Sequence, residues 1–176
     1  MSTASAKLEV LVGREIACVK ISGRANFSSS PDFKALLTGL AQKGYSHFII
    51  DLAECVLMDS TFLGVLAGFG LKMNRPVNSD GGVLELSNPN ARVTELLENL
   101  GALHLFKVIT GPLPLPDGVP ASAPDSVNPS REEITRTCLE AHQTLMAMNP
   151  GNVARFKDVA RFLAEDLNSL EKGKNR

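Results

Sequence analysis

Residues 47–70 read HFIIDLAECVLMDSTFLGVLAGFG, and the predicted fold is built around this stretch. Residues 47–52 form a short apolar run with β-branched residues in its middle, which indicates a buried strand. A turn is predicted over residues 53–58. Residues 62–73 are rich in Leu, Val, Ala, Phe and Gly and predict a helix. The stretch therefore predicts a strand, a turn and a helix in immediate succession.

Three polar residues, Asp59-Ser60-Thr61, stand directly before this predicted helix. Asp59 and Ser60 are alternative N-caps, because either side chain can accept a hydrogen bond from an amide of the first turn. In both cases the Ser60 hydroxyl lies at the exposed N-terminal end of a helix. A phosphate at that position would meet the positive end of the helix dipole and several free N–H groups. The position is therefore suited to a phosphorylation switch.

The run from Met58 to Leu66, MDSTFLGVL, closely resembles the phosphorylation motif of STAS-domain anti-sigma factor antagonists. That motif is roughly D-S-[ST]-G-L-G, and a partner kinase phosphorylates the serine directly after the Asp. The resemblance places the phosphoacceptor at Ser60, with Thr61 as its neighbour. Phe62 stands where the family usually has Gly.

A second family pattern, G-x-[LV]-D, precedes the first helix and carries an acidic residue near the phosphorylated serine. The corresponding run here is Gly23-Arg24-Ala25-Asn26, so Asn26 replaces the Asp and carries no charge. The resemblance covers about residues 7–110.

Composition excludes several classes of function. The chain has 176 residues, is 44% hydrophobic and 21% charged, and has a net charge of −1. This balance provides no basic surface for nucleic acid or membrane binding. No signal peptide is recognised at residues 1–6, and no apolar run is long enough to span a membrane. Three widely separated cysteines favour free thiols in a reducing compartment, so a cytoplasmic location is expected.

No catalytic, metal or cofactor site is predicted. Cys55 lies near the Ser60 turn, but no base is spaced to activate it, so a buried free thiol is expected. His47, His104 and His142 share no metal-ligand spacing and are interpreted as ordinary strand or surface residues. No acid–base pair is evident, and the chain is not expected to be an enzyme.

The remaining elements alternate between strands and helices. Strands are predicted over residues 7–12, 15–22, 47–52, 83–86 and 103–109, with loops at 23–29 and 74–82. Helices are predicted to start at Ser30-Pro31, with Ser30 as N-cap, and at Asn88-Pro89, and to end at Gly44 and Gly101. The order β-β-α-β-α-β-α-β predicts an α/β fold, a STAS-like mixed β-sheet with helices packed against it, over residues 1–110.

The last third of the chain lies outside this pattern. Residues 111–129 are rich in proline and predict an extended linker. Residues 130–176 predict a helical hairpin that begins with a capping box, Ser130 to Glu133, and turns at residues 149–152. Apolar residues recur at helical spacing on both arms. The hairpin is too small for a substantial core, so its apolar stripes need a partner surface.

The helix after Ser60 offers a candidate for that surface. Leu63, Leu66, Ala67 and Gly70 form a stripe suited to packing on the sheet, and the helix glycines indicate close packing there. Phe62, Val65 and Phe69 form a second stripe that would be an exposed apolar patch beside Ser60. We hypothesise that the hairpin docks on this patch, in the same chain or in a dimer mate, and limits access to Ser60. The alternative is a hairpin that pairs with another hairpin to form a homodimer.

The resemblance implies a phosphorylation-controlled protein-binding module. Unphosphorylated, it would bind an anti-sigma factor serine kinase, and phosphorylation of Ser60 would release it. The expected partner-binding or switch-adjacent residues are Asp59, Thr61, Asn26, Phe62, Val65 and Phe69. The alternative is a non-switching STAS scaffold, or a sensor or stressosome-type subunit, in which Ser60 is a structural helix cap.

Overall fold

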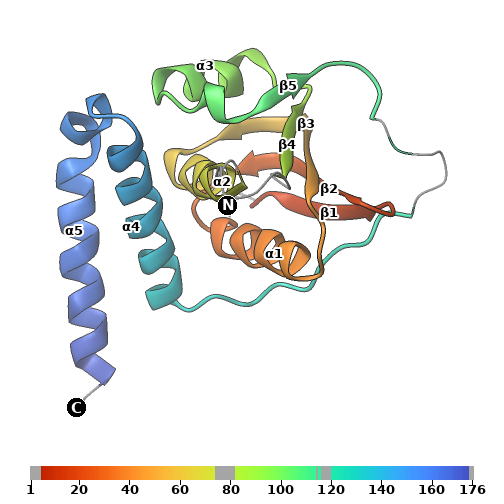
Figure 1. Cartoon of the computed structure of the whole chain (residues 1–176). Helices are drawn as coiled ribbons and strands as arrows, with labels where there is room; N and C mark the ends of the chain where they lie inside the picture. The colour runs from red at the N-terminus through yellow and green to blue at the C-terminus, as the bar shows by residue number, and fades with distance from the viewer. Residues whose placement is uncertain (1–4, 74–81, 114, 116–119, 175–176) are drawn as a thin grey trace.

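The computed structural model describes residues 5–73, 82–113, 115 and 120–174. Among these residues five strands form one sheet in the order β1-β2-β3-β4-β5 (Figure 1). The strands are β1 (Lys7–Val12), β2 (Ile16–Ala25), β3 (His47–Met58), β4 (Val83–Ser87) and β5 (Lys107–Ile109). The β1–β2 pair is antiparallel and every later pair is parallel. The predicted α/β fold with a mixed sheet is confirmed.

The helices are α1 (Ser30–Gln42), α2 (Ser60–Met73), α3 (Ala91–Asn99), α4 (Arg131–Met148) and α5 (Gly151–Lys174), with a short 3₁₀ turn, η1 (Leu103–Leu105), before β5. The first three alternate with strands in the predicted order. The last two form an antiparallel hairpin. In Figure 1, α4 lies beside α2, and α5 lies on the outer side of α4, away from the sheet.

The core lies between one face of the sheet and the helices, and alternate residues of β2 point into it. Val19 and Ile21 are fully buried and join one apolar cluster with Phe33 of α1 and Leu66 of α2. Lys20 points to the opposite face, since successive strand residues alternate. There it forms an ion pair with Glu54, with 3.4 Å between Nζ and Oε2. One face of the sheet therefore packs against helices. The other face carries this ion pair together with the fully buried side chains of Cys18 and Ile49.

The predicted exposed aromatic patch on α2 is wrong. Phe62 is fully buried and stacks on Phe33 of α1, with ring centroids 4.4 Å apart and 15° between the ring planes. Phe69 is partly buried and meets Phe48 edge-on at 4.9 Å. The stripe through Phe62 and Phe69 faces α1 and the sheet, so these aromatic rings belong to the core. Val65, in the same stripe, is partly buried.

The long pairing between β2 and β3 corrects two predicted boundaries. β3 continues to Met58 through the predicted turn at residues 53–58, and β2 continues to Ala25 into the predicted loop at residues 23–29. Ala25 pairs with Met58 in the parallel register. Each segment supplies the backbone partner for the other, so pairing extends both strands beyond the point where the local pattern ends.

Three further boundaries differ from prediction. Ser29 occupies the N-cap position of α1, and the Ser30 hydroxyl donates to the Phe27 carbonyl instead of capping. α3 begins after Asn90, whose side chain accepts from the Val93 amide, rather than at Asn88-Pro89. The predicted strand over 103–109 is η1 followed by the shorter β5. Of the predicted loop at 74–82, residues 74–81 lie outside the described residues.

The described part of the proline-rich segment is irregular and attached to the domain. Val10 of β1 and Ser122 exchange two backbone hydrogen bonds of 2.7 and 2.9 Å. Further on, the Asp32 carboxylate of α1 accepts from the Val127 amide at 2.8 Å and from the Ser126 hydroxyl. These contacts lead the chain along the β1 edge to α4. Ser130 then caps α4 by accepting from the Glu133 amide, the cap expected from the sequence.

Within the described residues, no helix combines the length and the apolar character needed to cross a membrane.

The Phe33–Phe62 stack leads to a prediction about stability. Phe62→Ala is expected to lower the free energy of unfolding by about 3–5 kcal/mol, because it leaves a cavity beneath α1 and removes the ring contact. The matched control is Phe162→Ala on α5, where the Phe162 side chain is 60% exposed. That change is expected to stay within about 0.5 kcal/mol. Urea unfolding of both full-length variants measures the difference, and equal losses would contradict the assignment of Phe62 to the core.

Candidate functional site

Asp59 builds the start of α2. Its amide donates to the Ala25 carbonyl at 2.9 Å, which places it directly after the last β2–β3 pair. One carboxylate oxygen, Oδ1, accepts from the Phe62 amide at 2.8 Å, and the other, Oδ2, accepts from the Phe27 amide at 2.6 Å. The first bond is that of an N-cap, and the second holds the β2–α1 loop against the helix. Asp59 is therefore the cap, and Ser60 is the first residue of α2.

Burial gives the Asp59 carboxylate an unusual electrostatic setting. Desolvation raises the pKa of Asp59 above its ordinary value, while the hydrogen bonds from the Phe62 and Phe27 amides act in the opposite direction. A positive charge on the nearby His142 ring also lowers the pKa of Asp59 when that ring is protonated. A partly desolvated acidic group thus lies next to Ser60 at the positive end of a helix.

Ser60 is joined to the C-terminal hairpin through His142. The Ser60 hydroxyl oxygen lies 3.0 Å from Nε2 of His142, and Nδ1 of the same ring lies 2.7 Å from the Cys138 carbonyl oxygen. A carbonyl can only accept, so Nδ1 carries the proton, and in the neutral ring Nε2 accepts from the Ser60 hydroxyl. His142 is only 5% exposed. The ring is therefore held by α4 and contacts the Ser60 side chain, and Ser60 is partly buried.

Two glycines allow α4 to approach α2 closely. A Cβ placed on Gly64 would lie 2.6 Å from both the Cβ and the carbonyl oxygen of Ala141, so a larger residue does not fit there. One turn later, a Cβ on Gly68 would lie 3.7 Å from the Thr144 side chain, which is an ordinary contact. Close packing on the sheet was expected for these glycines. They face α4 instead, whereas Gly70 does pack towards the sheet.

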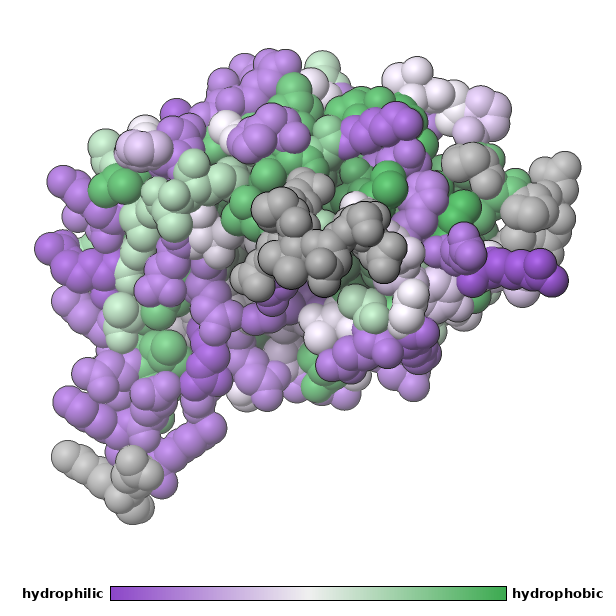
Figure 2. All heavy atoms as spheres, viewed as in Figure 1, coloured by the Kyte–Doolittle hydropathy of each residue, from purple (hydrophilic) through white to green (hydrophobic). Residues whose placement is uncertain are grey.

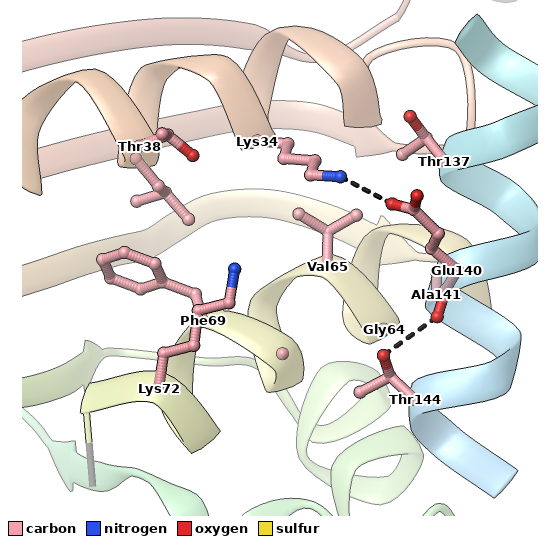
Figure 3. Close-up of a pocket in the computed structure, with 12 residues that line it drawn as sticks. Lys34, Thr38, Gly64, Val65, Phe69, Lys72, Thr137, Glu140, Ala141 and Thr144 are labelled. Carbon is pink, nitrogen blue, oxygen red and sulfur yellow. Dashed lines mark hydrogen bonds and ion pairs between the residues drawn. The ribbon is translucent and has the colours of Figure 1, made fainter. Parts of the chain in front are cut away.

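A groove of about 130 Å³ lies between α1, α2 and α4 (Figure 3). Val65 and Phe69 line it, and Lys34 of α1 reaches across its edge to Glu140 of α4, with 2.7 Å between Nζ and Oε2. Neither Ser60 nor His142 is among the residues lining this groove. The ion pair therefore adds a second polar contact between the domain and the hairpin, apart from the Ser60–His142 bond.

Two of the other predicted site residues, Thr61 and Asn26, have different surroundings. Thr61 is buried beside Cys138 of α4, so the hairpin covers it. Asn26 turns towards its own loop, where its side-chain oxygen accepts from the amide and hydroxyl of Ser28. The structure thus brings Asp59 and Thr61 next to Ser60 and leaves Asn26 engaged in a local turn.

His142 is the residue that sequence interpretation missed, because it was treated as an ordinary histidine. It lies four residues after Cys138 and next to Ala141, on the apolar stripe predicted for α4. A polar ring within an apolar helical stripe needs a buried partner, and this signal could have identified it. Its actual partner, Ser60, is 82 residues away in sequence.

The three cysteines do not have the lowered pKa that an activated nucleophile needs. Burial raises the pKa of Cys55 and of Cys138, and burial raises the pKa of Cys18 to about 12. All three are free and buried thiols. Among the described residues, no group of three or more His, Cys, Asp or Glu side chains is arranged to hold a metal ion.

Comparisons with known proteins identify the fold. A family model for the STAS domain matches residues 7–111, more than half of the chain. The crystal structure of a putative anti-sigma factor antagonist from Thermotoga maritima matches with a TM-score of 0.51 and 20% identity, over 59% of this chain and 86% of that one. An anti-sigma factor antagonist from Mycobacterium paratuberculosis matches with a TM-score of 0.50 and 14% identity, over 58% and 84%. At these identities the two structures show a shared fold.

The two hydrogen bonds to the Asp59 carboxylate lead to a second prediction. Asp59→Ala is expected to lower the free energy of unfolding by about 2 kcal/mol, because it removes the α2 cap and leaves the Phe27 amide without its acceptor. Glu98→Ala, at an exposed carboxylate of α3, is the control and is expected to cost less than about 0.5 kcal/mol. Urea unfolding at neutral pH measures both. A loss at Asp59 no larger than at Glu98 would show that the cap contributes nothing.

Proposed function

The chain belongs to the STAS domain family, and from that membership we propose that it is a protein-binding module controlled by phosphorylation of Ser60. The unphosphorylated form binds an anti-sigma factor serine kinase in the cytoplasm, and the phosphorylated form is released, which regulates transcription through a sigma factor. The observation that carries the proposal is the position of Ser60. It is the first residue of α2, and Asp59 is the N-cap, so the Ser60 hydroxyl does not cap the helix.

The chemistry of this position supports a switch that leaves the fold intact. A phosphoserine adds about −1.5 to −2 charges at pH 7. The N-terminal amides of α2 favour that charge, while the Asp59 carboxylate opposes it. The Asp59 bonds to the Phe27 and Phe62 amides do not involve the Ser60 side chain, so the strand–helix junction persists. Release of the partner follows from charge and bulk at the α2 surface.

The Ser60–His142 bond favours a second candidate function. If Ser60 serves only to attach α4 to α2, the protein is a non-switching STAS scaffold or a sensor or stressosome-type subunit. In both functions the protein acts by binding and not by catalysis. A homodimer formed through the hairpin is compatible with either, because α5 exposes Val159 and Phe162.

The proposed phosphorylation is tested by purifying the chain with any proteins that bind it and adding ATP. Ser60→Ala is expected to abolish phosphate incorporation, because the acceptor oxygen is removed. Thr61→Ala is the matched control at the adjacent hydroxyl, and it is expected to retain incorporation. Mass spectrometry of the wild-type product locates the phosphate. Phosphate on another residue, or a bound partner that never modifies Ser60, would refute the switch and support the scaffold.

A further inference from the structure

The face of α2 that carries Ser60 is covered by another part of the same chain. Three of the contacts that hold this cover are used below: Ser60 and Gly64 of α2 contact His142 and Ala141 of α4, and Lys34 of α1 pairs with Glu140 of α4. Figure 3 shows Ala141 of α4 close to Gly64 and Glu140 reaching towards Lys34. A kinase needs the Ser60 hydroxyl free, and in this arrangement that hydroxyl is bonded to a buried ring.

We propose that the hairpin is an intramolecular competitor for the partner-binding face of α2. With α4 in place, Ser60 is bonded to His142 and the face is closed; when α4 leaves, both the serine and the face become available. The biological meaning of this gate rests on the proposed function, whereas its existence does not. The structure thus assigns the hairpin to regulation of access, in the same chain that carries the phosphoacceptor.

Some of the contacts between the hairpin and the domain are of a kind that allows the hairpin to detach. The Lys34–Glu140 pair is about half exposed on both sides, and exposed ion pairs contribute little to stability. Gly64 and Ala141 bury little side-chain area, so their close approach depends on fit. Figure 2 shows that the outer surface of the hairpin next to the C-terminus carries mostly hydrophilic residues. Leu145 and Phe156 of the hairpin join the core cluster, and the buried Asn152 side chain donates to the Leu100 carbonyl at 3.0 Å, so opening must break these contacts as well.

The segment before α4 keeps the hairpin close after it leaves. Ser122 is bonded to Val10 of β1, and Val127 is bonded to Asp32 of α1, so the chain is attached to the domain only a few residues before α4. A short tether gives the released hairpin a high effective concentration, on the order of millimolar, at the α2 face. Closure is therefore fast and reversible, and a partner must outcompete it.

When the hairpin has left, the exposed face of α2 fits one kind of partner. Gly64 and Gly68 leave α2 flat, which admits the backbone of another helix at close range, as α4 shows. Lys34 stands at the edge and pairs with a carboxylate in α4. The partner that fits is thus a helix with a small residue against Gly64 and a neighbouring acidic residue towards Lys34. In this respect the partner's helix imitates Glu140 and Ala141.

Opening of the gate is measured in the full chain with a thiol at the switch position. Ser60→Cys provides the reporter, and its labelling by N-ethylmaleimide is followed by peptide mass spectrometry. Burial raises the pKa of the native thiols Cys18, Cys55 and Cys138, so their background reaction is slow. The rate at residue 60 then reports access without any kinase. If Ser60 is never phosphorylated, the proposed function fails while this measurement remains valid.

Gly64→Ala and Gly68→Ala, each added to the reporter, form the decisive pair. Both changes favour the helical state of α2 by a similar amount, but only a Cβ at residue 64 collides with α4. Gly64→Ala is expected to raise the labelling rate on the order of tenfold, as overpacking shifts a packing equilibrium by that factor or more. Gly68→Ala is expected to leave the rate unchanged. Amide exchange must show the sheet intact in both variants. Equal rates with an intact sheet would overturn the gate.

Substitutions on α4 instead of α2 test whether the exposed face of α2 binds a helix. Ala141→Leu places a large side chain against Gly64 and leaves α2 itself unchanged, whereas Gln143→Leu adds the same side chain at an exposed position of α4. Only Ala141→Leu is expected to speed labelling of the reporter. A synthetic peptide of residues 131–148 added to that variant should slow labelling again, and the same peptide with Ala141→Leu should not. Failure of the native peptide to restore protection would contradict the proposed helix-binding face.

Discussion

The Asp59 carboxylate makes the two hydrogen bonds on which the site depends. By accepting from the Phe62 and Phe27 amides, it fixes where α2 begins and holds the β2–α1 loop beside that point. The cost of keeping this group partly buried is visible in its raised pKa. Because Asp59 does the capping, the adjacent Ser60 is left with a hydroxyl available for another partner. In this structure that partner is His142.

The second constraint is the lack of a side chain at Gly64. The Ala141 backbone comes so close to α2 that no Cβ can be accommodated there, and this approach brings the His142 ring to Ser60. Gly64 is the last glycine of the phosphorylation motif. The same residue therefore belongs both to the pattern that marks the STAS family and to the contact that closes this chain upon itself. The family motif and the contact with the hairpin therefore lie on the same turn of α2.

Phe62 shows how a departure from a family pattern is accommodated. The family usually has a small residue at this position, and a large aromatic ring there was expected to need an external partner. The ring instead fills the space beneath α1 by stacking on Phe33. Such a stack buries both rings completely and needs no exposed surface. Phe62 therefore needs no contact with the hairpin, which reaches α2 at Gly64 and Ser60.

The sequence alone determined the order of strands and helices and the family, because these follow from local periodicity and motif. It left Asp59 and Ser60 as alternative caps of α2, and the structure shows Asp59 in that role. The sequence could not place the end of β2 or of β3, since each extends only because the other supplies its backbone partner. Nor could it identify the partner of His142: a polar ring on an apolar helical stripe indicates that a buried partner is needed, but that partner, Ser60, lies 82 positions away. Local sequence patterns are sufficient to predict individual strands and helices. The covering of Ser60 was decided by the tertiary structure, because it depends on how closely two helices distant in sequence can approach.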